Sequence, residues 1–181
     1  ETVLPTYTMM QQAQIGTFGH YLVAWALPLE RDFERLTGAY DRTNVSSAGA
    51  GIGTGSDFSL NRFRTAELLG FSAVCDNTRD ANAGRDYALE SLSAITILML
   101  NIAWSTDTIY LFCSNEFNFV EIADRYCGSS SIMPQKKNPH SLMEVAETAS
   151  QLSGALGAMM TNARSISGSL KSALANFDKA A

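Results

Sequence analysis

The order of apolar and polar positions along the chain predicts long helices. Over 85–114 the apolar residues recur three and four positions apart, and acidic and hydroxyl side chains fill the other faces. Such a helix is about 45 Å long at roughly 1.5 Å per residue, more than a single domain of ~180 residues normally buries. We therefore expect helices of other subunits to cover part of it. Its apolar positions are Leu89, Leu92, Ile95, Met99, Ile102, Ile109 and Phe112.

Two further long helices are predicted over 14–39 and 141–163, and the proline-free segment 60–70 is another candidate helix. Pro28 lies inside the first of them, so we expect a kink or a split there, because proline removes a backbone hydrogen bond. No strand signal of comparable length is present, so the expected fold class is all-α, a bundle of long helices. The stripe of the 14–39 helix that we expect to face a core is Phe18, Tyr21, Leu22, Trp25, Leu29 and Phe33.

The stretch 44–57 contains SSAGAGIGTGSD, a loop with four glycines. A phosphate-binding loop needs the spacing GxGxxG or GxxxxGK[ST], and neither spacing occurs here. The glycines therefore favour a tight connection made of small residues over a nucleotide site.

Composition and charge exclude several classes of function. The 181 residues are 46% hydrophobic and 17% charged, which is typical of a globular chain with a core. A net charge of −5, with no basic run longer than two residues, argues against binding to nucleic acid. The apolar stretch 94–104 is too short to span a membrane, which takes about 20 residues. The three cysteines and two histidines are too scattered for a zinc site, so we expect free thiols in the cytoplasm and no metal or cofactor.

The segment that carries chemistry lies between Cys127 and His140 and reads CGSSSIMPQKKNPH. It holds two of the four lysines of the chain, a run of serines, an asparagine, and the expected start of a helix. A hydroxyl, an ammonium group, an amide and the N–H groups of a helix start all favour an anionic carboxylate. We therefore expect a substrate that bears a carboxylate.

SSSIMPQKKNP is similar to GSSxMPxKxNP, the signature of the fumarase/aspartase superfamily, and the flanking motifs resemble its argininosuccinate lyase branch. The resemblance runs in order from Pro5 to about Leu156. It implies a bundle of long helices in a homotetramer, with active sites built from three subunits, in a protein more than twice this length. Residues 1–181 would then be the central domain of a longer lyase, which fits a chain that begins at Glu1 without Met. The flanking motifs are PTYTMMQQAQ, FGHYL, LERDFERL, RTNVSSAGAG, TAELLGF and EFNFVEIADRYC.

The resemblance implies a β-elimination that releases fumarate from an N-succinyl amine. By residue-for-residue correspondence, Ser130 is the base that removes the proton beside a carboxylate. Lys136 and Asn138 hold that carboxylate and its developing charge, and Thr8 of another subunit binds the same fumaryl half. Ser131 and Met133 shape the pocket.

The chain departs from the family pattern at several positions. Met9 stands where the family has His and Met143 where it has the Glu that pairs with that His, so a polar contact has become apolar. Ser129 replaces the signature Gly. The motif YNxDxQEDK, which serves the amine half of argininosuccinate, is not visible downstream, where ARSISGSLKSALANFDKAA stands instead.

These departures leave three hypotheses open: a lyase for another N-succinyl amine, a non-catalytic member of the family, and an authentic argininosuccinate lyase. His140, at an Asp position of the family, is a candidate proton donor for the leaving amine or else a solvated residue at a helix start. His20 is expected to be a satisfied structural histidine.

Overall fold

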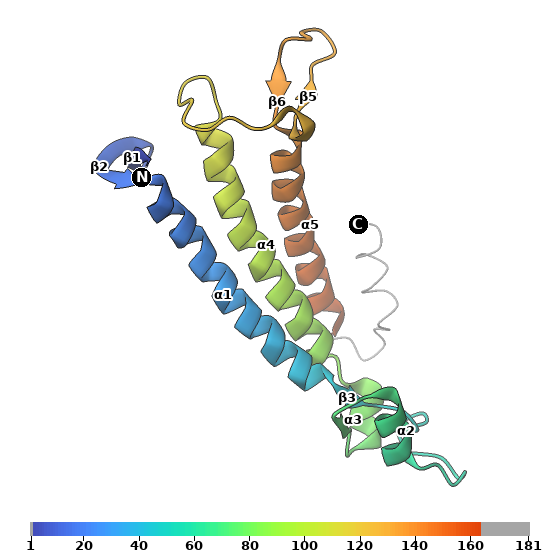
Figure 1. The fold of residues 1–181 in the computed structure, drawn as a ribbon. Helices are drawn as coiled ribbons and strands as arrows, with labels where there is room; N and C mark the ends of the chain where they lie inside the picture. Colours follow the sequence, from blue (N-terminus) through green and yellow to red (C-terminus); the bar gives the residue numbers. More distant parts are fainter. Residues whose placement is uncertain (1, 164–181) are drawn as a thin grey trace.

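The computed structural model describes residues 2–163, in which three long helices lie side by side (Figure 1). They are α1 (Phe18–Thr43), α4 (Asp86–Phe112) and α5 (His140–Ala163), and α4 packs between the other two. The helices expected over 85–114 and 141–163 are confirmed to within two residues at each end. The all-α fold class is confirmed as well, since the strands are short and form only two-stranded pairs.

The first residues of the chain form a hairpin that the sequence analysis did not predict. Strands β1 (Val3–Thr8) and β2 (Gln11–Thr17) pair antiparallel. The turn between them places Met9 at φ 50° and Met10 at φ 62°, a conformation in which glycine or asparagine is usual. The Thr17 hydroxyl then caps α1 by accepting a hydrogen bond from the His20 N–H at 3.2 Å. The helix therefore begins at Phe18, and the prediction that it begins near residue 14 was wrong.

Helix α1 differs from the prediction in its buried face too. It runs unbroken through Pro28 to Thr43, so the helix does not split. Trp25 of the predicted stripe is buried, but the Phe33 side chain is 71% exposed. Asp32 is fully buried instead, where it accepts hydrogen bonds from Arg35 at 2.6 Å and from Asn101 of α4 at 2.7 Å. A polar contact thus joins α1 to α4 near the middle of both helices.

The end of the bundle opposite the chain's first hairpin is a small unit of short elements (Figure 1). It contains β3 (Val45–Ser46) paired parallel with β4 (Ala73–Val74), and the helices α2 (Arg62–Leu69) and α3 (Thr78–Ala83). The glycine loop lies here as a tight connection: Gly51 has φ 61°, and a Cβ on it would lie 2.2 Å from the Gly55 carbonyl oxygen. The structural interpretation of 44–57 therefore fits the observed backbone.

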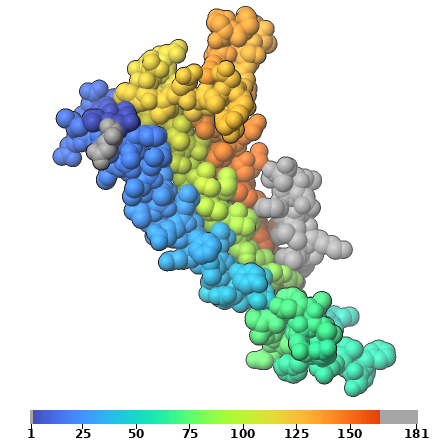
Figure 2. Space-filling view, viewed as in Figure 1, coloured from blue at the N-terminus to red at the C-terminus, as the bar shows by residue number. Residues whose placement is uncertain are grey.

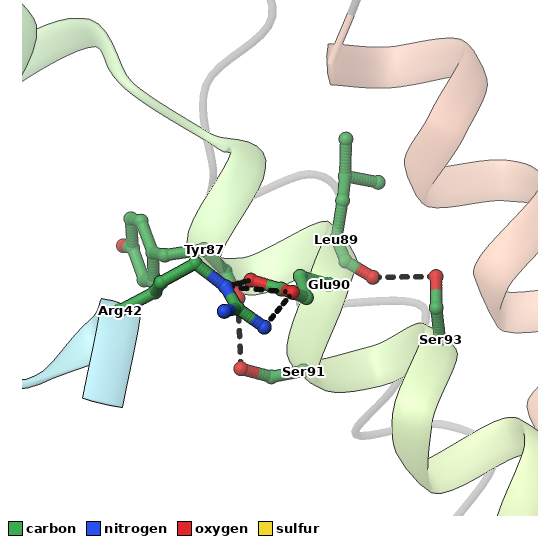
Figure 3. Close-up of polar contacts among 6 residues, drawn as sticks. All are labelled: Arg42, Tyr87, Leu89, Glu90, Ser91 and Ser93. Carbon is green, nitrogen blue, oxygen red and sulfur yellow. Dashed lines mark hydrogen bonds and ion pairs between the residues drawn. The ribbon is translucent and has the colours of Figure 1, made fainter. Parts of the chain in front are cut away.

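Beside this unit, an ion pair joins α1 to α4 (Figure 3). Arg42, at the end of α1, donates from Nε to both carboxylate oxygens of Glu90 in α4, at 2.9 and 2.8 Å. The shared hydrogen bonds raise the pKa of Arg42 and lower the pKa of Glu90. The two-oxygen contact holds the last turn of α1 against α4.

Much apolar surface lies open on the three helices. The chain of 19.6 kDa exposes 12629 Å², whereas a folded monomer of that mass exposes about 8,600 Å². The elongated outline in Figure 2 agrees with this large surface. Among the described helices, α4 alone has the length and apolar character that a membrane span requires, a test that core helices of soluble proteins also pass.

Candidate active site

The signature segment forms a small antiparallel hairpin at the start of α5 (Figure 1). It follows the 3-10 turn η1 (Asp124–Tyr126) and consists of β5 (Gly128–Ser129), the loop 130–136, and β6 (Lys137–Asn138). Gly128 lies opposite Asn138, and Ser129 lies opposite Lys137. This register brings the two ends of the loop together, so Ser130 and Lys136 stand at its base.

Ser130 differs from its neighbouring serines in its hydrogen bonds. Its Oγ accepts hydrogen bonds from the backbone N–H groups of Ile132 and Met133, each at 3.3 Å, and the residue is half-buried. Two N–H donors directed at one oxygen favour negative charge on it. Ser131, by contrast, is exposed. The backbone of the loop therefore distinguishes the Ser130 oxygen from that of its neighbour.

Lys136 and Asn138 line a cavity of about 790 Å³ beside the hairpin, together with Met133. The Lys136 N–H donates to the Met133 carbonyl at 3.0 Å and closes the turn at Pro134. Lys136 is exposed and Asn138 half-buried, so both can reach a molecule in the cavity. Ser130 and Ser131 are not among the residues that line it, although the hairpin register holds their end of the loop beside that of Lys136.

Lys137 makes ion pairs that the sequence does not predict. The Lys137 ammonium lies 2.7 Å from Asp124 Oδ1 and 3.2 Å from Glu121 Oε1. The hydrogen bond from Lys137 lowers the pKa of Asp124, and the same bond, with a smaller contribution from Glu121, raises the pKa of Lys137. The three charges are 13 and 16 positions apart in the chain, a spacing that matches no local pattern. Only the folded hairpin shows that they meet.

Thr8 lies on the other hairpin, at the same end of the bundle (Figure 1). It is exposed at the end of β1, and its own chain does not bring it into the lining of the Lys136 cavity. The Tyr7 ring fixes this hairpin by packing on Phe117 and Phe119, with ring centroids 5.2 and 6.3 Å away. Both hairpins are therefore anchored to the segment that follows α4.

The two positions where methionine replaces a family residue are open to solvent. Met9 is 98% exposed at the tip of the first hairpin, and Met143 is 44% exposed in the first turn of α5. The segment ARSISGSLKSALANFDKAA stands where the motif for the amine half was expected. All of it except Ala163 lies outside the described residues.

The two histidines occupy different places. The His140 ring lies against Gly128, where a Cβ would stand 2.9 Å from Cδ2, so the ring covers the base of the signature hairpin. His20 is exposed and lines a second cavity of about 800 Å³ with Tyr7 and Met9. No hydrogen bond from the His20 side chain is present within residues 2–163, and the prediction of a satisfied structural histidine was wrong.

Two cysteines, Cys113 and Cys127, line the same cavity as Lys136. Burial raises the pKa of the Cys113 thiol, and the neighbouring Cys127 adds to the effect, so Cys113 stays protonated near neutral pH. Within the described part of the chain, no three His, Cys, Asp or Glu side chains are grouped so as to hold a metal ion.

Comparison with known proteins identifies the family of this chain. A family model described as "Lyase" matches residues 1–154. The chain is 41% identical over 166 residues to argininosuccinate lyase of Nitrosopumilus maritimus. The aligned residues make up 92% of this chain and 34% of the relative. It is 47% identical over 139 residues to argininosuccinate lyase of Psychrobacter cryohalolentis, and these residues make up 77% of this chain and 30% of the relative. The chain belongs to the argininosuccinate lyase family. It spans about a third of the length of these relatives.

A solved structure extends the family likeness to the fold. An EDDS lyase variant with bound fumarate matches 96% of this chain and 35% of its own, with a TM-score of 0.90 and 33% sequence identity. Membership of the argininosuccinate lyase family, within the fumarase/aspartase superfamily, confirms the resemblance inferred from the signature segment.

Proposed function

We propose that this chain is the central part of a carbon–nitrogen lyase that eliminates an amine from an N-succinyl compound and releases fumarate. The observation that carries the proposal is the signature hairpin, in which Ser130 Oγ accepts two backbone N–H groups at one end of the loop while Lys136 and Asn138 line a cavity at the other. The family relatives and the fumarate bound to the EDDS lyase variant support the same chemistry.

In this reaction the Ser130 hydroxyl first loses its own proton to solvent, and the resulting alkoxide takes a proton from the carbon beside a carboxylate. Electrons of that C–H bond move into the carboxylate, which becomes a dianionic aci-carboxylate, and they then return to form the double bond of fumarate as the C–N bond breaks. The amine leaves with a proton from solvent or from a neighbouring donor. Because the proton removed is very weakly acidic, stabilisation of the dianion matters most, and one such donor is worth about 3 to 4 kcal/mol. Lys136 and Asn138 supply it.

The proposed site is completed by other copies of the chain. Thr8 of a second subunit binds the fumaryl half, while Ser131 and Met133 shape the pocket in the first. A homotetramer is supported by the exposed apolar faces of the three helices and by a surface about 4,000 Å² larger than that expected of a monomer. We place the protein in the cytoplasm, in agreement with its three free cysteines.

The amine half of the substrate differs from that of argininosuccinate in this proposal. Met9 and Met143 replace the family's His and Glu, so the polar pair that those residues make is gone. An apolar pair in the same place suits a substrate whose leaving amine needs no contact with a charged histidine. A non-catalytic role is the competing proposal, and the same two methionines favour it.

The test follows fumarate by its ultraviolet absorbance, with the longest form of the protein that its gene encodes. The forward reaction is run with argininosuccinate, and the reverse reaction with fumarate and a panel of amines and amino acids that includes arginine. Consumption of fumarate with any amine supports the lyase and identifies its substrate. Absence of reaction across the panel, in a protein that is assembled, contradicts the lyase and favours the non-catalytic role.

A further inference from the structure

Two adjacent lysines stand where the signature loop returns to β6, and acidic side chains bind only one of them. The Lys137 ammonium contacts Asp124 at 2.7 Å and Glu121 at 3.2 Å. Its neighbour Lys136 makes no ion pair with any residue in 2–163. Although the two side chains are chemically identical, the charge of Lys137 is already neutralised, and the charge of Lys136 is available to a ligand.

The contacts of Lys137 close the base of the loop. Strands β5 and β6 share only the pairs Gly128 with Asn138 and Ser129 with Lys137. A ladder this short is marginal on its own, so other contacts must hold it. Lys137 lies on the returning strand, and its two acidic partners precede β5. The ion pairs therefore fasten one end of the loop to the segment that leads into the other end.

The ion pairs of Lys137 also bear on its two neighbours in the chain, Lys136 and Asn138. Side chains next to each other on an extended segment lie on opposite faces, and those two positions apart lie on the same face. Lys136, Lys137, Asn138 and Glu121 all line the same cavity, so this alternation does not take Lys137 out of it. The ion pair to Asp124 is what distinguishes Lys137 from Lys136. A slip of this segment by one position would exchange the two lysines.

We propose that Lys137, Asp124 and Glu121 form a clamp that positions Lys136 and Asn138 for the carboxylate of the substrate. Lys137 is a positioning residue in this clamp, and it also neutralises two carboxylates that would repel an anionic substrate. The inference rests on the lyase function proposed above, since it assigns Lys136 and not Lys137 to the substrate. Both acids are largely exposed, so the clamp adds little to the stability of the fold.

The kinetic test compares three variants of the full-length protein with its best substrate. Lys137→Met is expected to lower kcat/KM on the order of ten-fold, mainly through KM, because the anion then meets two uncompensated carboxylates and a looser loop. Lys137→Arg keeps the charge and is expected to retain most of the wild-type KM. The matched control is Arg64→Met, which removes an exposed ion pair to Glu67 (2.7 Å) on α2 and is expected to leave KM unchanged.

A second measurement decides the clamp without turnover. Hydrogen exchange of the amides in 130–136 is expected to be faster in Lys137→Met than in the wild type, and unchanged in Lys136→Met. If the wild-type protein reacts with none of the amines, the proposed function is contradicted, but the exchange result still tests the clamp. Unchanged exchange in Lys137→Met overturns the clamp whatever the activity, and faster exchange with an unchanged KM overturns its positioning role.

Discussion

Three consecutive serines begin the signature loop, and their surroundings separate them. Ser130 alone among them accepts two backbone N–H groups, from Ile132 and Met133, while Ser129 lies in the ladder with Lys137. Sequence pattern cannot make this distinction, because three identical residues in a row carry the same local signal. The assignment of Ser130 came from the family signature, and the hydrogen bonds now supply a physical reason for it.

Replacement of this serine is the most direct test at the residue scale. We expect Ser130→Ala to lower kcat by about 10²- to 10⁴-fold with little change in KM, because it removes the base and keeps the carboxylate contacts. Ser131→Ala, an exposed neighbour, serves as the matched control and should retain most of the activity. Steady-state kinetics with fumarate detection measures both. Full activity of Ser130→Ala would remove it from the role of base.

The clamp gives a prediction for pH. The pKa of Asp124 is lowered from 3.8 by its hydrogen bond with Lys137, and the pKa of Lys137 is raised from 10.5. Because the pKa of Asp124 is lowered, its ion pair stabilises the folded protein at pH above 3.8, and this stabilisation is lost as pH falls through the lowered pKa. Because the pKa of Lys137 is raised, its contribution is complete at pH below 10.5 and is lost as pH rises through the raised pKa. The clamp should therefore stay charged throughout the neutral range.

The effect of pH on the clamp can be measured by hydrogen exchange of the amides in 130–136, corrected for the intrinsic effect of pH. The measurement compares the wild type with Asp124→Asn. We expect the variant to exchange faster by a constant factor at neutral pH, and the two proteins to converge only as pH falls below 3.8. Convergence near neutral pH would assign control of the loop to another titrating group.

At the scale of elements, the sequence predicted the helices well where one pattern ran uninterrupted. The boundaries of α4 and α5 follow from apolar spacing and from prolines outside the helices. The first hairpin was missed because Met9 and Met10 form its turn, and neither residue is a turn former. The ion pairs of Lys137 were missed for a different reason, since long-range pairing between charges leaves no trace in local sequence.

Asp32 is the element-scale contact with the clearest energetic consequence. It is fully buried in α1 and accepts hydrogen bonds from Arg35 and from Asn101 of α4. Asp32→Ala leaves both donors without their partner, and we expect it to lower the free energy of unfolding by about 3 kcal/mol or more. Chemical denaturation compares it with Glu34→Ala, an exposed acidic residue of the same helix. Equal stability of the two variants would show that the buried contact is dispensable.

At the scale of the whole molecule, the long helices leave large apolar side chains exposed. Helix α4 has α1 on one side and α5 on the other, yet Ile97, Leu100 and Trp104 remain exposed. Their spacing of three and four positions puts them on one stripe of the helix. An apolar stripe of this kind on a helix between two others is suited to a further helix from another subunit.

Leu100→Glu places a charge in that stripe, and we expect it to break the proposed homotetramer into smaller species because a buried carboxylate without a partner is costly. Native mass spectrometry or light scattering of the full-length protein measures the change. Leu69→Glu on α2, more open to solvent than Leu100 but outside the three long helices, is the control and should leave the mass unchanged. Since Thr8 of another subunit belongs to the proposed site, loss of the tetramer should abolish fumarate release too. A wild-type protein that is a stable monomer would contradict both the assembly and the shared site.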